Sequence, residues 1–179
     1  MTSLCTVVVC GAPLAARAPE IAARLVDAGW RVQAITTPSA GDWVDDAVLT
    51  AAAGLPVHSE HRAVDTPKNR EHPDVVVVAP ITFNTVGKLA SGIADTYAHS
   101  ALCEALGDRV PILAVPMVNN RLWGHPAWLP NIDRLTNAGV SWLNIHDGTI
   151  GEPKPVQSGT GDSVVKRFDP EWISAQLRK

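Results

Sequence analysis

Short runs of β-branched apolar residues alternate along the chain with longer segments whose apolar residues recur at helical spacing. Continuous apolar runs of about four to eight residues between turn residues are typical of buried strands, and apolar positions about every three to four residues of helices. On this basis we predict six strands, at residues 4–11, 31–37, 55–58, 74–80, 110–116 and 140–145. We predict helices at residues 14–29, 42–54, 84–94, 97–106 and 127–138.

The strands at residues 74–80 ("DVVVVAP") and 110–116 ("VPILAVP") are apolar without alternation. This pattern is typical of central parallel strands that are covered on both faces. Strands that alternate with helices indicate a parallel sheet with helices on both sides, so the expected fold is a three-layer α/β fold with a six-stranded sheet.

Two segments interrupt this alternation. Residues 59–73 are polar and contain two prolines, and residues 146–163 are rich in Gly, Pro and Ser, so both are predicted to be loops. A last helix is expected beyond the second loop, with Asp169 as N-cap and Pro170 at its first position. The pattern contains no internal repeat and predicts no second domain.

Composition narrows the class of protein. The chain has 179 residues, 46% of them hydrophobic and 18% charged, with a net charge of −3 and no dense basic run. A nucleic-acid groove and a membrane surface are therefore not expected, and no apolar stretch reaches the ~20 residues of a membrane helix. The segment "MTSLCTVVVCGAP" lacks the basic start of a signal peptide, so we expect a cytoplasmic protein.

The three cysteines, Cys5, Cys10 and Cys103, form no CxxC pair. Neither a disulfide framework nor a metal site is expected from them. Cys5 and Cys10 have opposite parity on one strand, so their side chains should face opposite sides of the sheet.

In parallel α/β sheets, ligands bind beyond the carboxyl ends of the strands. After the first strand, "CGAPLAARAP" has a single glycine and is neither a GxGxxG nor a Walker loop. After the second, "TTPSAGDW" supplies hydroxyl groups that can bind a phosphate. A plain turn explains the first segment equally well, and a helix cap explains the second.

Two further strand ends carry polar residues. "APITFNT" places Thr82, Asn84 and Thr85 where the fourth strand has ended, and "PMVNNRLWGHPAW" gathers Asn, Arg, Trp and His after the fifth. An asparagine offers both a donor and an acceptor to a ring edge. The alternative for both segments is that the polar side chains cap the following helices.

These segments resemble a known family. "PITFNT" is similar to the PASANT motif, and "PMVNNRLW" to the PxMNxxMW motif, of the homo-oligomeric flavin-containing cysteine decarboxylases, such as phosphopantothenoylcysteine decarboxylases. The segments "GKLASGIADT" and "HPAWLPNIDRLTNAGV" that follow the two motifs are also similar, and the resemblance covers residues 7–143.

The resemblance implies a Rossmann-like, flavodoxin-like fold. Residues 1–145 would form the flavin-binding domain, and residues 146–179 a flexible lid loop and C-terminal helix of the same domain. It also implies FMN at the subunit interface of a homo-oligomer, either a trimer or a dodecamer of trimers, and a small-molecule or peptide substrate.

The family's site residues map onto this chain by motif position. Ser39 matches a phosphate-binding serine, Trp43 an aromatic residue near the flavin, and Asn119 an asparagine that holds the substrate carboxylate. His58 and His61 match no motif position, but they are closest to the end of the strand predicted at residues 55–58, so they are the candidate bases. The alternative is that both are solvated loop histidines. The expected cofactor-binding residues are Gly11, Ala12, Pro13, Thr37, Ser39, Trp43, Pro80, Thr82, Phe83, Asn84, Thr85, Pro116 and Met117.

The chain also departs from the family pattern. Thr82 and Phe83 replace small residues of the first motif, Thr66 stands where the family has a histidine, and the tail loop has no cysteine. Three functions therefore stay open: FMN-dependent decarboxylation of a cysteine-type thiol acid, other flavin chemistry such as redox or prenyl transfer, and a non-catalytic regulatory role.

Overall fold

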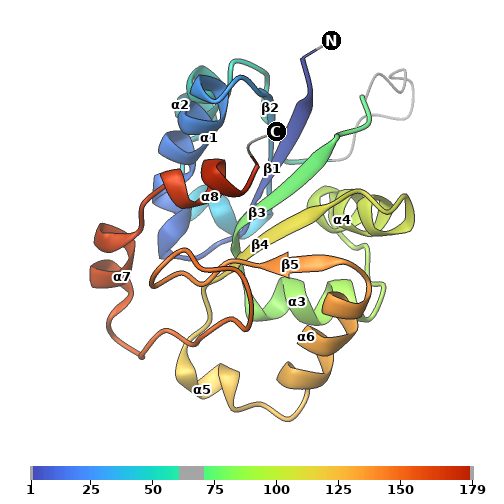
Figure 1. Cartoon of the computed structure of the whole chain (residues 1–179), viewed down its shortest axis with the longest axis vertical. Helices are drawn as coiled ribbons and strands as arrows, with labels where there is room; N and C mark the ends of the chain where they lie inside the picture. Colours follow the sequence, from blue (N-terminus) through green and yellow to red (C-terminus); the bar gives the residue numbers. More distant parts are fainter. Residues whose placement is uncertain (1, 61–70, 178–179) are drawn as a thin grey trace.

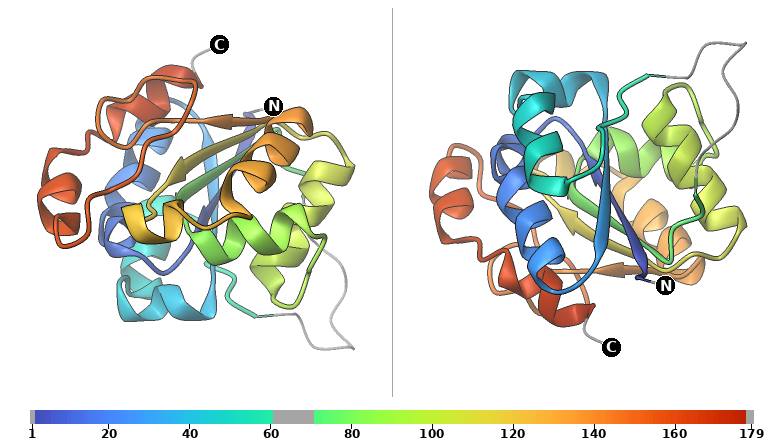
Figure 2. Two further views of the ribbon diagram at one scale, coloured as in Figure 1. Left: turned by 90° about the horizontal axis from the view of Figure 1, so that it is seen from below. Right: turned by 90° about the horizontal axis from the view of Figure 1, so that it is seen from above.

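In the computed structural model, which describes residues 2–60 and 71–177, five parallel strands form one sheet between two layers of helices (Figures 1 and 2). The strand order is β2-β1-β3-β4-β5, so the direction of winding reverses between β1 and β3. This is the order of flavodoxin-like folds, which open a crevice at that reversal. The strands are β1 (Leu4–Val9), β2 (Arg31–Thr36), β3 (Val75–Ile81), β4 (Ile112–Pro116) and β5 (Val140–Trp142).

The central strands are buried on both faces, as their continuous apolar sequence predicts. Every residue of β1, β3 and β4 is buried. Val7 and Val8 of β1 pair with Val77 and Val78 of β3, so valines stack across the centre of the sheet. The expected three-layer α/β fold is confirmed.

Helices cover both faces of the sheet (Figure 2). Cys5 belongs to the apolar cluster under one layer and Cys10 to the cluster under the other, which confirms that they face opposite sides. All three cysteines are free. The first layer contains α1 (Ala18–Asp27), α2 (Asp46–Ala53) and α8 (Glu171–Gln176), and the second contains α3 (Phe83–Ala90), α4 (Tyr97–Gly107) and α6 (Trp128–Asn137).

The prediction of a six-stranded sheet is wrong by one strand. Residues 55–58 make only an isolated bridge, in which the N–H of His58 donates to Ala34 and its carbonyl accepts from Thr36. Pro56 has no N–H to donate, so it cannot extend this pairing. The last strand is also shorter than predicted, because the chain after Trp142 turns into an antiparallel bridge between Leu143 and Ile150.

Two predicted helices begin later than expected, each after a 3₁₀ turn. The helix expected at residues 14–29 is divided into η1 (Pro13–Arg17) and α1, with Pro19 in the first turn of α1. The helix expected at residues 42–54 follows η2 (Pro38–Asp42), and it begins at Asp46 because the Asp45 carboxylate accepts from the N–H groups of Ala47 and Val48.

Two short helices were not predicted: α5 (Asn120–Trp123) after β4 and α7 (Gly161–Arg167) in the tail. Helix α8 lies where a last helix was expected. Its N-cap is Pro170 rather than Asp169, although the Asp169 carboxylate accepts from the N–H of Glu171 at 2.9 Å. Among the described residues, no helix is both long and apolar enough to cross a membrane.

Candidate functional site

A cavity of about 810 Å³ lies at the carboxyl edge of the sheet. Its wall is built from the segments that follow β1, β2, β3 and β4, together with residues 156–162 of the tail. It therefore occupies the crevice that the strand order creates, where ligands of this fold class bind.

Most of the residues expected at a site line this cavity. Pro80 and Pro116 do not, since they lie within β3 and at the end of β4. His58 is also absent from the wall, and its ring lies 5.9 Å from that of Tyr97. His61 and Thr66 lie outside the described residues. The expected residues that line the cavity are Gly11, Ala12, Pro13, Thr37, Ser39, Trp43, Thr82, Phe83, Asn84, Thr85, Met117 and Asn119.

The segments after β1 and β2 meet at Gly11. A Cβ at this position would overlap the carbonyl oxygen of Ser39 and lie 2.7 Å from its carbonyl carbon. The Ser39 hydroxyl in turn lies 3.3 Å from that of Thr37. Glycine is therefore required at position 11 by close approach of two backbones, which brings the hydroxyl pair to the cavity wall.

Capping and cavity lining are combined in the same residues. The Thr82 hydroxyl accepts from the N–H of Thr85 at the start of α3. Asn119 Oδ1 accepts from the N–H groups of Arg121 and Leu122, both at 3.0 Å, at the start of α5. Each side chain satisfies backbone donors that the helix leaves free, and each also lines the cavity.

The large side chain of Phe83 is accommodated by α6. Its ring stacks on Trp128 with a centroid distance of 5.7 Å and an interplanar angle of 19°. The ring of His125 makes a T-shaped contact with it, at a centroid distance of 5.5 Å and an interplanar angle of 74°. Phe83 thus packs against the second helical layer while part of it lines the cavity.

Six polar residues of the wall were not among the expected site residues: Lys88, Thr96 and His99 between β3 and β4, and Gln157, Ser158 and Asp162 in the tail. Thr96 is the N-cap of α4, and His99 lies in the first turn of that helix. The signal was present in "ADTYAHSAL", where a capping threonine precedes a histidine by three residues. A threonine before a helix predicts only a cap, and the packing of the structure is needed to show that the histidine is buried beside the cavity.

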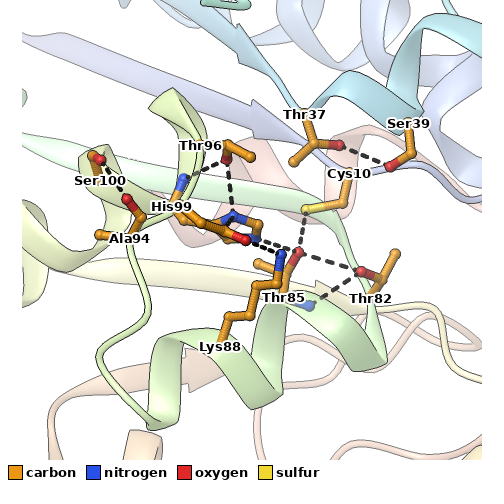
Figure 3. A network of polar contacts seen from close by, with 11 residues as sticks. Cys10, Thr37, Ser39, Thr82, Thr85, Lys88, Ala94, Thr96, His99 and Ser100 are labelled. Atoms are coloured by element: carbon orange, nitrogen blue, oxygen red, sulfur yellow. Dashed lines mark hydrogen bonds and ion pairs between the residues drawn. The ribbon is translucent and has the colours of Figure 1, made fainter. Parts of the chain in front are cut away.

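His99 is 3% exposed and sits at the centre of a polar network (Figure 3). Its Nδ1 lies 2.9 Å from the Asp95 carboxylate and 2.9 Å from the Thr96 hydroxyl. Its Nε2 lies 3.3 Å from the Thr85 hydroxyl. Asp95 also pairs with Lys88 at 2.7 Å, so the network is anchored by an ion pair at its outer end.

The network continues from Thr85 toward β1 and the start of α3. The Thr85 hydroxyl lies 3.3 Å from the Cys10 thiol and accepts from the Thr82 hydroxyl at 3.3 Å. Burial raises the pKa of the Cys10 thiol to about 11, and its interactions with the Thr85 side chain and the Thr82 backbone oppose the rise. Cys10 is therefore a neutral thiol at physiological pH and not a nucleophile.

Burial lowers the pKa of His99, and the nearby positive charge of Lys88 lowers it further, against the opposing effect of Asp95. The hydrogen bond from Lys88 keeps the pKa of Asp95 below its ordinary value. The network at neutral pH therefore pairs a charged carboxylate with a neutral imidazole.

The tail is hydrogen-bonded to the segment after β4. Val156 donates its N–H to Val118 at 2.9 Å and accepts from Asn120 at 2.9 Å. The N–H of Ser158 donates to the side-chain oxygen of Asn120 at 2.9 Å. These bonds place residues 156–159 on the cavity wall. No group of His, Cys, Asp or Glu within the described ranges is arranged to hold a metal ion.

The chain matches the family model described as Flavoprotein over residues 3–165. It is 30% identical over 146 residues to the coenzyme A biosynthesis bifunctional protein CoaBC of Mycolicibacterium smegmatis, an alignment that covers 79% of this chain and 34% of that protein. The chain thus spans about a third of the length of that bifunctional relative.

For two other similar proteins, the alignment with this chain covers most of the relative. The probable phosphopantothenoylcysteine decarboxylase of Streptococcus mutans is 28% identical, over 78% of this chain and 80% of that protein. The FMN-dependent cysteine decarboxylase TvaF from thioviridamide biosynthesis is 28% identical with a TM-score of 0.67, over 78% of this chain and 90% of that chain.

Replacing Gly11 by Ala should destabilise the protein by about 1–3 kcal/mol, because the new methyl group is forced against the backbone of Ser39. Chemical denaturation followed by circular dichroism measures the change. Gly41→Ala is the matched control, since a Cβ there meets no atom within 4 Å. Its effect should stay within about 0.5 kcal/mol. Equal stability of the two variants would contradict the close approach at Gly11.

Stability should depend on pH through His99. Its pKa is lower in the folded than in the unfolded chain, so the unfolded chain binds a proton more readily below the ordinary value of 6.5. The free energy of unfolding should therefore fall as pH drops below that value, by at most about 1.4 kcal/mol per pH unit for this group. Urea denaturation from about pH 5 to 8 measures the slope.

His99→Gln should remove this part of the slope. His72→Gln is the control, because the His72 side chain is 83% exposed. This variant should retain the dependence of the unfolding free energy on pH. An unchanged slope in His99→Gln would show that His99 is not the group responsible.

Proposed function

The chain belongs to the flavoprotein family, and on this premise we propose that it binds FMN in the cavity and uses it to decarboxylate a cysteine-type thiol acid oxidatively. The observation that carries the proposal is that the two motif segments, after β3 and after β4, line one cavity together with the hydroxyl pair after β2. The similar proteins named above include one described as FMN-dependent and two described as acting on cysteine derivatives.

The residues of the cavity fit this cofactor. Its volume of about 810 Å³ lies within the range of cofactor pockets, about 300–1,000 Å³. The hydroxyls of Thr37 and Ser39 are donors for the phosphate, and Trp43, which is 44% exposed, offers an aromatic face near the ring. Asn84 is exposed at the cavity, where its amide can meet the polar edge of the ring.

Bound FMN supplies a two-electron acceptor that can take a hydride from the carbon beside the thiol. The thiol proton passes to the protein, and oxidation gives a thioaldehyde. The carboxylate then leaves as carbon dioxide, and its electron pair forms the double bond of an enethiolate. The protein has to orient the thiol and the carboxylate and to accept one proton.

Asn119 is suited to the carboxylate. Its Oδ1 is occupied by the N–H groups of Arg121 and Leu122, which fixes the amide so that Nδ2 points its donors elsewhere. Because Asn119 lines the cavity, these donors are available to a negatively charged ligand group. The helix cap thus orients the amide that would hold the substrate.

None of the chain's three cysteines lines the cavity. We therefore expect the protein to release the enethiol, with the electrons passing to an external oxidant such as dioxygen. A thiol near the cavity would be needed to return them to the product. The two possible products, the enethiol and the saturated thiol, can be distinguished by mass, since the enethiol has two hydrogens fewer.

The proposal includes a cytoplasmic homo-oligomer, a trimer or a dodecamer of trimers, with the cavity at a subunit interface. Trp43 and Leu122 support this, because both line the cavity and are 44% and 43% exposed. Large apolar side chains at a cavity mouth are suited to a covering subunit. Free cysteines fit a reducing compartment.

Adding FMN to flavin-free protein should raise the stability by about 2.7 kcal/mol at a hundredfold excess over its dissociation constant. Thermal unfolding with FMN and with riboflavin measures this, and riboflavin should stabilise less because it lacks the phosphate. In Ser39→Ala the difference between the two ligands should shrink. If neither ligand shifts the unfolding temperature of the parent protein, the proposed cofactor is wrong.

Asn119→Ser and Asn119→Ala separate capping from substrate binding. Serine retains a capping oxygen, so only the alanine variant should lose the cap, at a cost of about 0.5–2 kcal/mol. Both remove the amide donors, and both should lower decarboxylation about ten- to a hundredfold while retaining FMN. Mass spectrometry of phosphopantothenoylcysteine and of a peptide ending in cysteine measures turnover. Full activity in Asn119→Ser would restrict Asn119 to its structural role.

A further inference from the structure

His99 is held at both ring nitrogens, and its partners determine where its proton lies. The Asp95 carboxylate can only accept, and it lies 2.9 Å from Nδ1. The proton is therefore on Nδ1, and Nε2 carries a lone pair. This lone pair faces the Thr85 hydroxyl at 3.3 Å, so Thr85 is the donor and His99 the acceptor.

The hydrogen bonds between Thr85 and the cavity can all run in the same direction, toward His99. Since the Thr85 hydroxyl donates to His99, its oxygen is free to accept, and the Thr82 hydroxyl donates to it at 3.3 Å. Thr85 is 1% exposed, whereas Thr82 is only half-buried. Thr82 accepts from the N–H of Thr85, and its oxygen has a second lone pair that can accept from a ligand in the cavity.

Charges from the surrounding elements keep the imidazole able to accept a proton. Within the described part of the chain, the charged groups that act on the ring are Lys88 of α3 and Asp95, which precedes α4, and β1 contributes the neutral thiol of Cys10. Burial and Lys88 disfavour the imidazolium at neutral pH, while Asp95 stabilises it once it forms. A neutral base with a carboxylate behind it is suited to transient protonation.

We propose that Thr82, Thr85, His99 and Asp95 form a proton relay from the cavity to a buried base. A ligand group X–H donates its proton to the Thr82 oxygen, Thr82 passes its own to Thr85, and Thr85 passes its own to Nε2 of His99. The ligand retains the electron pair as X⁻, and the imidazolium is paired with Asp95 at Nδ1. That X–H is the substrate thiol rests on the proposed function; the direction of the relay does not.

The direction of the relay is tested without substrate or flavin. In ¹⁵N NMR spectra of the purified protein at about pH 7, the resonance that disappears in His99→Gln identifies His99. It should show a protonated Nδ1 and an unprotonated Nε2. A proton on Nε2, or on both nitrogens, would mean that His99 donates to Thr85 and would overturn the relay.

Its use is tested by the rate of flavin reduction on mixing FMN-loaded protein with phosphopantothenoylcysteine. His99→Gln should retain FMN binding within about threefold but reduce flavin about a hundredfold more slowly. In the parent protein, the rate of flavin reduction should fall at acid pH because His99 becomes protonated. In His99→Gln this fall should be absent. His72→Gln should match the parent in both respects.

Thr85→Val and Thr85→Ser add a test that does not alter the histidine. Valine has nearly the shape of threonine without the hydroxyl and should slow reduction as His99→Gln does, whereas serine retains the hydroxyl and should restore the rate to within about tenfold. A parent-like rate and pH profile in His99→Gln would overturn the relay. If the parent protein neither binds FMN nor turns over substrate, the proposed function fails and the NMR result alone decides on the relay.

Discussion

The site depends on one topological constraint: the strand order reverses between β1 and β3, so the connections after these strands leave on opposite faces of the sheet. No helix can cover the edge where they diverge, and a crevice results. The two segments that border it are still tied together, because the N–H of Cys10 donates to the carbonyl of Pro80 at 3.2 Å. The crevice is therefore a fixed feature of the backbone, and the side chains at the strand ends determine its chemistry.

Those side chains are fixed by the helices that they begin. Thr82, Thr96 and Asn119 cap α3, α4 and α5, and all three line the cavity. A strand end that leads directly into a helix must supply an acceptor for the first helical N–H groups. The same acceptor is then held at the cavity wall. For Thr82 and Asn119, a cap and a place at the site were alternatives at the level of sequence, and in the structure each residue both caps a helix and lines the cavity.

The fold and much of the cavity wall could be predicted because they follow from local pattern. Apolar runs located the central strands, and the rule for parallel sheets located the segments after them. Residues 55–58 misled the strand count, since only His58 makes a bridge and Pro56 has no N–H to extend the pairing, which apolar content does not reveal. The place of His99 in the wall could not be predicted, and the tail was expected as a lid loop without named wall residues. His99 reaches the cavity through the docking of α4, and residues 156–162 through the bonds of Val156 to Val118 and Asn120. Such contacts join distant parts of the chain and leave no periodic signal.

Phe83, which departs from the family pattern, and His99, which lies outside both motifs, have different roles in the structure. Phe83 is large where the family is small, yet its ring stacks on Trp128, so α6 accommodates much of its bulk. His99 has the opposite character: it is a titratable group that the fold buries at 3% exposure and surrounds with a carboxylate and hydroxyls. A buried imidazole is stable only when both nitrogens are satisfied. Since Thr85 satisfies one of them from inside the motif, the histidine and the motif form one polar unit, and the chemistry of the cavity cannot be assigned to the motif residues alone.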